Sequence, residues 1–251
     1  MTAHSGERLM NVKSAGFSLV ELMVAMIVMM IVLAGIFGVI DVVNQRSSME
    51  QAKLDMFQEA REFMDQMSRD LHQAGYPSHR HYLGTGILTA DPVINDVKNA
   101  VGIVKVSAGD LWFEGDVDGA GQVSVVRYHL DTGTSNGCPC LRRSQLPKVE
   151  GNPVDGQSTE QYQVQVQGVQ NTDIFSAFSR GTTGVPIALP VDFTTDSTVI
   201  ANVDTIKVIL SLRSPTEDPK TGQHPQTTLV TTSKLNNCSQ AATAAAMSCD
   251  Q

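Results

Sequence analysis

An uncharged apolar run near the N-terminus constrains this chain more than any other feature. From Leu22 to Ile40 all 19 residues are Leu, Met, Val, Ala, Ile, Gly or Phe. A helix of about 20 such residues spans the hydrocarbon core of a bilayer. No comparable run follows, so the sequence predicts one membrane-spanning segment near the N-terminus and a separate soluble remainder.

A single carboxylate, Glu21, directly precedes this run. An ordinary membrane anchor explains the length of the run but not the acid, because an ionised side chain inside a bilayer costs about 3 kcal/mol on insertion scales. One alternative is a helix-edge acid close to the lipid headgroups. An alternative for the whole segment is a secretory signal. The apolar stretch of such a signal is shorter and is followed by a small-residue cleavage site, which this sequence lacks.

The six residues from Gly16 to Glu21, Gly-Phe-Ser-Leu-Val-Glu, carry a more specific pattern. This segment resembles the prepilin signature of the type IV pilin-like proteins. The resemblance implies that prepilin peptidase cuts between Gly16 and Phe17 and that the new N-terminal Phe17 is then N-methylated. Residues 1–16 would be the leader, held in the cytoplasm by Arg8 and Lys13. Met10 is a second possible start, which would give a compact leader.

Glu21 is the fifth residue after the implied cut. We hypothesise that it pairs, after assembly, with the α-amine of Phe17 in a neighbouring subunit. Such a pair offsets the desolvation of the carboxylate and sets the axial register of the new subunit.

The helix is predicted to continue beyond the membrane. Residues 41–74 contain neither Pro nor Gly, and Gly75 followed by Tyr76 and Pro77 is a typical helix end. We therefore expect a transmembrane or assembly half over residues 17–40 and an amphipathic half over residues 41–76. The apolar stripe of the second half has a spacing near 3.5 and comprises Met49, Met56, Ala60, Phe63, Met67 and Leu71.

Residues 77–251 change to short β-like runs broken by Gly, Pro, Asp and Asn. They predict a periplasmic β-rich globular domain, so the expected fold is α+β, the type IV pilin fold. In it the long N-terminal helix packs on a mostly antiparallel sheet. Long loops are expected at Asn136–Ser158 and Ser176–Asp196. The expected strands are Val101–Val106, Leu111–Glu114, Gln122–His129, Gln161–Val166, Val203–Leu212 and Thr227–Leu235.

Weaker similarities further along the chain point to one group within the type IV pilin-like proteins. Five segments are similar to minor pilins of the PilW kind: residues 69–76, Leu141–Ser144 (as a short strand), Val208–Pro215, 218–222 and 235–237. This implies a subunit of the inner membrane, single-pass with a periplasmic domain, that later joins the pilus fibre. Its implied partners are prepilin peptidase, other minor pilins, the major pilin and the inner-membrane assembly platform. Its implied role is pilus initiation, serving adhesion, twitching motility or DNA uptake.

Two alternatives remain open: a type II secretion minor pseudopilin of the GspJ kind, and a membrane-tethered periplasmic binding domain. Catalysis is not expected, because the chain has no Gly-x-Ser-x-Gly, Walker or His-Glu-x-x-His motif. Its net charge of −8 gives no general attraction for nucleic acid.

An acidic loop suggests calcium as the one candidate cofactor. Glu114, Asp116 and Asp118, followed by Gly119, resemble the first half of a calcium-binding loop. The second half fails, because Val125 stands where a bidentate Glu is expected. The alternative is an acidic hairpin turn.

The four cysteines are Cys138, Cys140, Cys238 and Cys249. Disulfides are expected if the domain is exported, with three possible pairings. The pilin resemblance favours a C-terminal bridge between Cys238 and Cys249, with a Cys138–Cys140 bridge or cross-pairing as alternatives. The spacing is a poor match to a structural zinc site.

Overall fold

The computed structural model describes residues 16–133, 138–155, 160–181, 184–218 and 221–237. The leader up to residue 15, Cys238 and Cys249 lie outside the described residues. The chain divides into two compact units, one ending at Ser48 and the other beginning at Met49. Each is described separately below.

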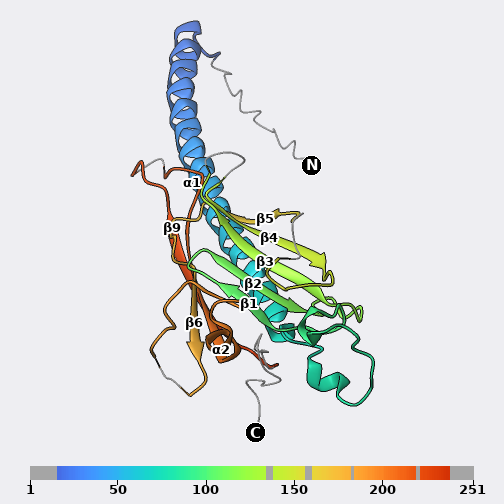
Figure 1. The fold of residues 1–251 in the computed structure, drawn as a ribbon. Helices are drawn as coiled ribbons and strands as arrows, with labels where there is room; N and C mark the ends of the chain where they lie inside the picture. Colours follow the sequence, from blue (N-terminus) through green and yellow to red (C-terminus); the bar gives the residue numbers. More distant parts are fainter. Residues whose placement is uncertain (1–15, 134–137, 156–159, 182–183, 219–220, 238–251) are drawn as a thin grey trace, which may run out of the picture. The chain divides into compact units, whose positions relative to one another are not determined.

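Helix α1 runs from Leu19 to Gln73 over 55 residues and is the longest element in Figure 1. It ends where the sequence predicts, because Gly75 adopts the left-handed conformation, φ 79°, that a helix C-terminus favours. The amide of Tyr76 then donates to the carbonyl of Gln73 at 3.1 Å, which closes the last turn. The first unit contains only the part of this helix up to Ser48 and the residues before it.

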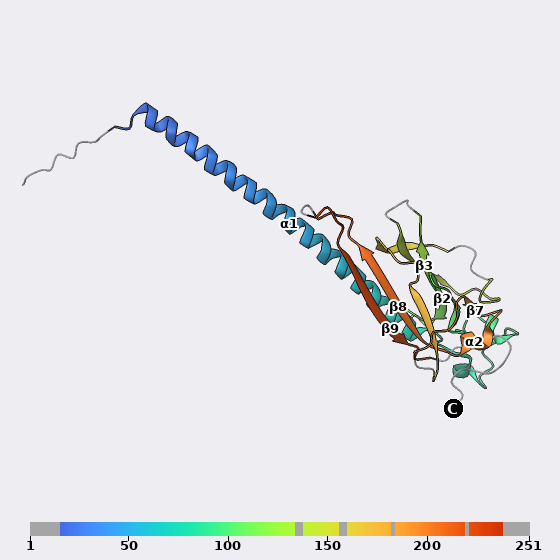
Figure 2. The same cartoon turned by 90° about the vertical axis from the view of Figure 1, so that its left-hand side faces the viewer.

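The second unit carries two antiparallel sheets, which Figures 1 and 2 show as separate groups of strands. The larger sheet has the strand order β5-β4-β3-β2-β1-β7 and the smaller has the order β6-β8-β9. The six strands of the larger sheet are β1 (Ile103–Val106), β2 (Asp110–Gly115), β3 (Ser124–Asp131), β4 (Cys140–Pro147), β5 (Gln163–Gln167) and β7 (Val191–Asp192). The smaller sheet has β6 (Phe175–Ser179), β8 (Val203–Arg213) and β9 (Gln226–Lys234).

Short helical elements lie between the strands. Helix α2 (Ser197–Ala201) connects β7 to β8, and the 3₁₀ turns His79–Tyr82 and Val93–Asn95 lie between α1 and β1.

One hydrophobic core joins the second half of α1 to both sheets. The predicted stripe contributes Phe63, Met67 and Leu71, each no more than 3% exposed. The rings of Phe63 and of Tyr128 on β3 pack edge to face at a centroid distance of 5.6 Å. On the other side, Ser68 lies 3.5 Å from the hydroxyl of Ser233 on β9. This packing explains why the amphipathic stripe is helical: it fills the space between the sheets. The fold is the expected pilin-like α+β arrangement.

Two loop predictions are wrong. The expected loop Asn136–Ser158 contains all of β4, and the expected loop Ser176–Asp196 contains β7 and nearly all of β6. Strand β4 contains charged side chains whose ion partners lie elsewhere in the fold. Because these charged residues replace part of the usual apolar alternation, the sequence did not indicate a strand here. The expectation that Leu141–Ser144 form a short strand is confirmed, since those residues lie inside β4. The strands also form two sheets rather than one.

Candidate processing and assembly segment

Residues 16–18 precede α1 and have no helical structure. Phe17 is 84% exposed, and a methyl group added to Gly16 would meet no atom within 4 Å. A protease binds its substrate in an open backbone conformation, and a bond inside a helix does not offer one. The Gly16–Phe17 bond lies directly outside the helix that begins at Leu19.

Glu21 lies in the first turn of α1. The helix begins with the amide of Leu22 donating to the carbonyl of Ser18 at 3.1 Å. An acid in a first turn gains about 0.3–1 kcal/mol from the helix dipole. That gain is smaller than the cost of about 3 kcal/mol for a charge within a bilayer. The helix terminus alone would not offset the cost of placing this carboxylate in a bilayer.

The first part of α1 exposes its whole circumference. Every residue from Phe17 to Ile40 is exposed, and none of the apolar stretch is covered by the described part of the chain. By length and composition this is one helix able to cross a membrane. Fully burying one Leu, Ile or Met side chain contributes roughly 1.5–3 kcal/mol. A surface of this size therefore requires lipid or other apolar helices around it.

A buried carboxylate fixes the second half of α1 to the larger sheet. Asp70 Oδ2 accepts hydrogen bonds from the Tyr128 hydroxyl at 2.6 Å and from Arg143 Nε at 2.9 Å. Burial and the nearby Asp70 charge hold the pKa of Tyr128 well above its usual value. The pKa of Arg143 is also raised: burial opposes this, but Tyr128 and Asp70 outweigh it. Tyr128 and Arg143 therefore both keep their protons at neutral pH. The sequence did not single out these three residues, because Asp70 is one of many acidic residues on α1 next to the apolar stripe.

The candidate calcium ligands are not brought together. Glu114 is fully buried, and its Oε2 accepts hydrogen bonds from Lys148 Nζ at 2.8 Å and from the amide of Val101 at 3.1 Å. Asp116 accepts from the amide of Gly121, and Asp118 from the amide of Ala120. Among the described residues the three carboxylates form no cluster of the kind that holds a metal. The alternative of an acidic turn between β2 and β3 fits this geometry.

Lys148, which the sequence did not single out, is the partner of Glu114. Both side chains are 1% exposed, and the lysine also donates to the carbonyls of Ile94 at 2.8 Å and Asn99 at 2.7 Å. All three of its donors are therefore used. Burial raises the pKa of Glu114, although the lysine charge and hydrogen bonds oppose that shift. No sequence signal marks this pair, because its members are 34 residues apart.

Cys138 and Cys140 form a disulfide. Within the described ranges, Asp131 and these two sulfurs are the only ligand atoms that converge like a metal site. Because the sulfurs are bonded to each other, they are not available as thiolate ligands in this state. The favoured pairing of Cys238 with Cys249 lies outside the described residues.

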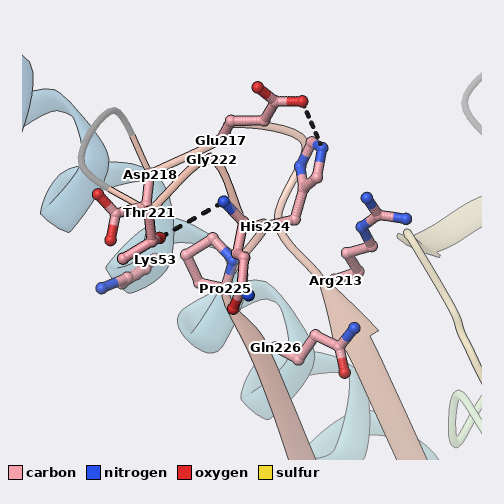
Figure 3. A pocket seen from close by; sticks show the side chains of 10 residues that line it. Lys53, Arg213, Glu217, Asp218, Thr221, Gly222, His224, Pro225 and Gln226 are labelled. Atoms are coloured by element: carbon pink, nitrogen blue, oxygen red, sulfur yellow. Dashed lines mark hydrogen bonds and ion pairs between the residues drawn. The ribbon is translucent and has the colours of Figure 1, made fainter.

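A surface pocket of about 840 Å³ lies where β8 and β9 are connected. Figure 3 shows its lining side chains, with Lys53 and Arg213 on opposite sides. His224 is held by Glu217 at 3.3 Å and by the carbonyl of Ser214 at 2.9 Å. The basic and acidic groups are interspersed, so this pocket does not present a cluster of one charge.

Comparison with known proteins agrees with the geometry of the N-terminal segment. Residues 11–37 match the family model of the prokaryotic N-terminal methylation motif. No curated protein matches the chain significantly, and neither does any solved structure.

The motif and the fold together define a class. A prepilin-type N-terminus leads into a long apolar helix, and that helix packs on antiparallel sheets. The chain combines a prepilin-type N-terminus with a pilin-like α+β fold, and its N-terminal segment indicates processing by prepilin peptidase and anchoring in the inner membrane.

Proposed function

We propose that this protein is a minor type IV pilin of the PilW kind, which takes part in initiating the pilus fibre. The observation that carries the proposal is the continuity of the methylation motif, residues 11–37, with an exposed apolar helix that ends inside a β-rich unit. The motif directs processing by prepilin peptidase, which is the first step of assembly. The helix supplies the surface that other subunits cover, and the β-rich unit remains in the periplasm.

Processing is proposed to occur between Gly16 and Phe17, followed by N-methylation of Phe17. The non-helical backbone at residues 16–18 supports this position. Cleavage here leaves the whole of α1 on the mature protein. It also creates a cationic amine four residues before Glu21, which is the opposite charge that a neighbouring subunit's carboxylate needs.

The central experiment is mass spectrometry of the N-terminal peptide from the membrane and sheared-fibre fractions. We expect a methylated Phe17 as the first residue in both fractions. A mature chain that starts elsewhere would refute the proposed processing, and an unprocessed chain would favour a tethered periplasmic binding domain.

A matched pair of variants tests the role of Glu21. Glu21→Ala removes the proposed register contact, so the protein should be cleaved normally but lost from the fibre fraction. Glu62→Ala changes an exposed acid of the same helix and should be incorporated normally. Normal incorporation of Glu21→Ala would contradict the register hypothesis while leaving the processing site intact.

The second candidate is a type II secretion minor pseudopilin of the GspJ kind, because pilins and pseudopilins share the N-terminal motif. Crosslinking in intact cells separates the two functions. We expect the major pilin and other minor pilins among the crosslinked partners. Recovery of secretion-system components in their place would favour the pseudopilin.

A further inference from the structure

The disulfide between Cys138 and Cys140 has a poor structural explanation. It encloses only Pro139, at the point where the chain enters β4. The stabilisation from a disulfide grows with the length of the loop it closes, because it acts mainly on the freedom of the unfolded chain. A loop with one enclosed residue gains the least from such a bond. Loop closure therefore does not account for this bond.

The two sulfurs differ in access. Cys140 is completely buried, whereas Cys138 is half-buried and lies just outside the strand. Thiol–disulfide exchange begins with in-line attack by an external thiolate on one sulfur. Cys138 is the sulfur that an external thiolate can reach, and Cys140 is then the leaving group.

A cation is placed against this leaving group. Arg142 Nε lies 3.5 Å from Cys140 Sγ, and its Nη2 lies 3.6 Å from Cys138 Sγ. Arg142 follows Cys140 by two residues in β4, so both side chains project from the same face. N–H donors from a guanidinium stabilise a thiolate more than a thiol.

Other titratable groups on the same face of the sheet lie next to the Arg142 guanidinium. Asp131 on β3 pairs with Cys140 across the sheet and binds Arg142 Nη2 at 2.8 Å. Its negative charge opposes thiolate formation, but its ion pair fixes the guanidinium beside the sulfurs. His129 stands opposite Arg142 in the same strand pair. This is the half-exposed, cation-bearing environment in which reactive cysteines occur.

We propose that Cys138–Cys140 is a redox-active disulfide that oxidises dithiols by thiol–disulfide exchange. A thiolate of the dithiol attacks Cys138 Sγ, forming a mixed disulfide, and the Cys138–Cys140 bond breaks. Cys140 leaves as a thiolate stabilised by Arg142. The second thiol of the dithiol loses its proton and attacks the mixed disulfide, which releases Cys138. Two thiols are oxidised to a disulfide, one disulfide is reduced to two thiols, and the protons pass to the released cysteines.

The test uses the full chain in detergent with dithiothreitol as the dithiol. Cys238→Ser and Cys249→Ser are introduced together, so that only Cys138 and Cys140 can react. Alkylation of the released thiols, followed by mass spectrometry, gives the rate of reduction at pH 7. Arg142→Gln should lower this rate about threefold for each unit by which the pKa of the leaving thiol rises, because exchange rates follow thiol pKa with a Brønsted slope of about 0.5. Arg142→Lys keeps the charge and should lose less.

Controls distinguish chemistry from misfolding. Arg61→Gln removes an exposed arginine of α1 and should react like the parent. Trp112, the only tryptophan, is 6% exposed on β2, and its fluorescence reports whether each variant is folded. A disulfide that resists millimolar dithiothreitol would overturn the proposal. Equal rates for the parent and a folded Arg142→Gln variant would overturn it too, as would a non-reducing peptide map without the Cys138–Cys140 link.

Discussion

Replacing Lys148 with methionine tests the buried ion pair. Methionine matches most of the volume of lysine but removes its charge and its three hydrogen bonds, to Glu114 Oε2 and to the carbonyls of Ile94 and Asn99. The carboxylate keeps the amide of Val101 as a donor but loses its cationic partner. A charge without its partner then remains in a site where the side chain is 1% exposed.

Breaking a buried pair by removing one partner costs about 3–5 kcal/mol. For a domain of this size such a loss lowers Tm by roughly 10 °C. The loss should depend on pH, because burial already raises the pKa of Glu114 and removing the lysine raises it further. A buried carboxyl with a raised pKa is best tolerated when protonated. The variant is therefore most stable below pH 4.5, the ordinary pKa of the group, and loses stability as the pH rises through the raised pKa.

Urea unfolding of the full chain in detergent, followed by Trp112 fluorescence, measures the free energy of unfolding at pH 5 and pH 8. The deficit of Lys148→Met should be larger at pH 8. The double variant Glu114→Gln with Lys148→Met should recover at least about 1 kcal/mol there, because no unpaired charge remains. Lys98→Met, an exposed control, should change stability by less than about 0.5 kcal/mol. A loss below about 1 kcal/mol for Lys148→Met at pH 8 would refute this reasoning.

Three further stability changes follow from the packing of α1 and are measured by the same unfolding assay. Asp70→Asn should cost about 3 kcal/mol, because Arg143 loses its buried counter-charge, whereas Tyr128→Phe should cost about 1 kcal/mol by removing one hydrogen bond. Equal losses for these two variants would argue against the charge as the main contribution. Gly115→Ala should cost about 1–3 kcal/mol, because the added Cβ would lie 2.4 Å from the carbonyl oxygen of Gln73. An unchanged midpoint for Gly115→Ala would show that the helix end moves freely.

The local features of this chain could be read from its sequence. The methylation motif depends on contiguous residues, so Gly16, Phe17 and Glu21 are recognisable without any fold. The end of α1 at Gly75 is equally local, because it depends on the left-handed conformation of one residue. The apolar stripe of the second half predicted a packed face, and its members Phe63 and Met67 are buried.

The features that sequence could not provide depend on partners distant in the chain. Glu114 was a candidate calcium ligand because its spacing from the next two acids is visible in the sequence. The burial of its side chain is not visible there. Its partner Lys148 comes 34 residues later. Strand β4 lacked apolar alternation because Arg143 pairs with Asp70, 73 residues earlier. A charged residue in a strand looks solvent-exposed until its counter-charge is located, and that requires the tertiary structure.

The carboxylates Glu21 and Asp70 lie near the two ends of α1. In each case the question is what fixes the position of the helix against its neighbours. Apolar packing of Phe63, Met67 and similar side chains holds the helix in the β-rich unit, but dispersion contacts are weakly directional and permit sliding. The hydrogen bonds of Asp70 are directional and fix the rotation and axial position of α1 within that unit. In the proposed fibre, Glu21 does the same between subunits, where uniformly apolar helices would otherwise have no defined register. The buried Asp70 therefore specifies the position of α1 within its unit, and the proposed contact of Glu21 would specify its position in the fibre.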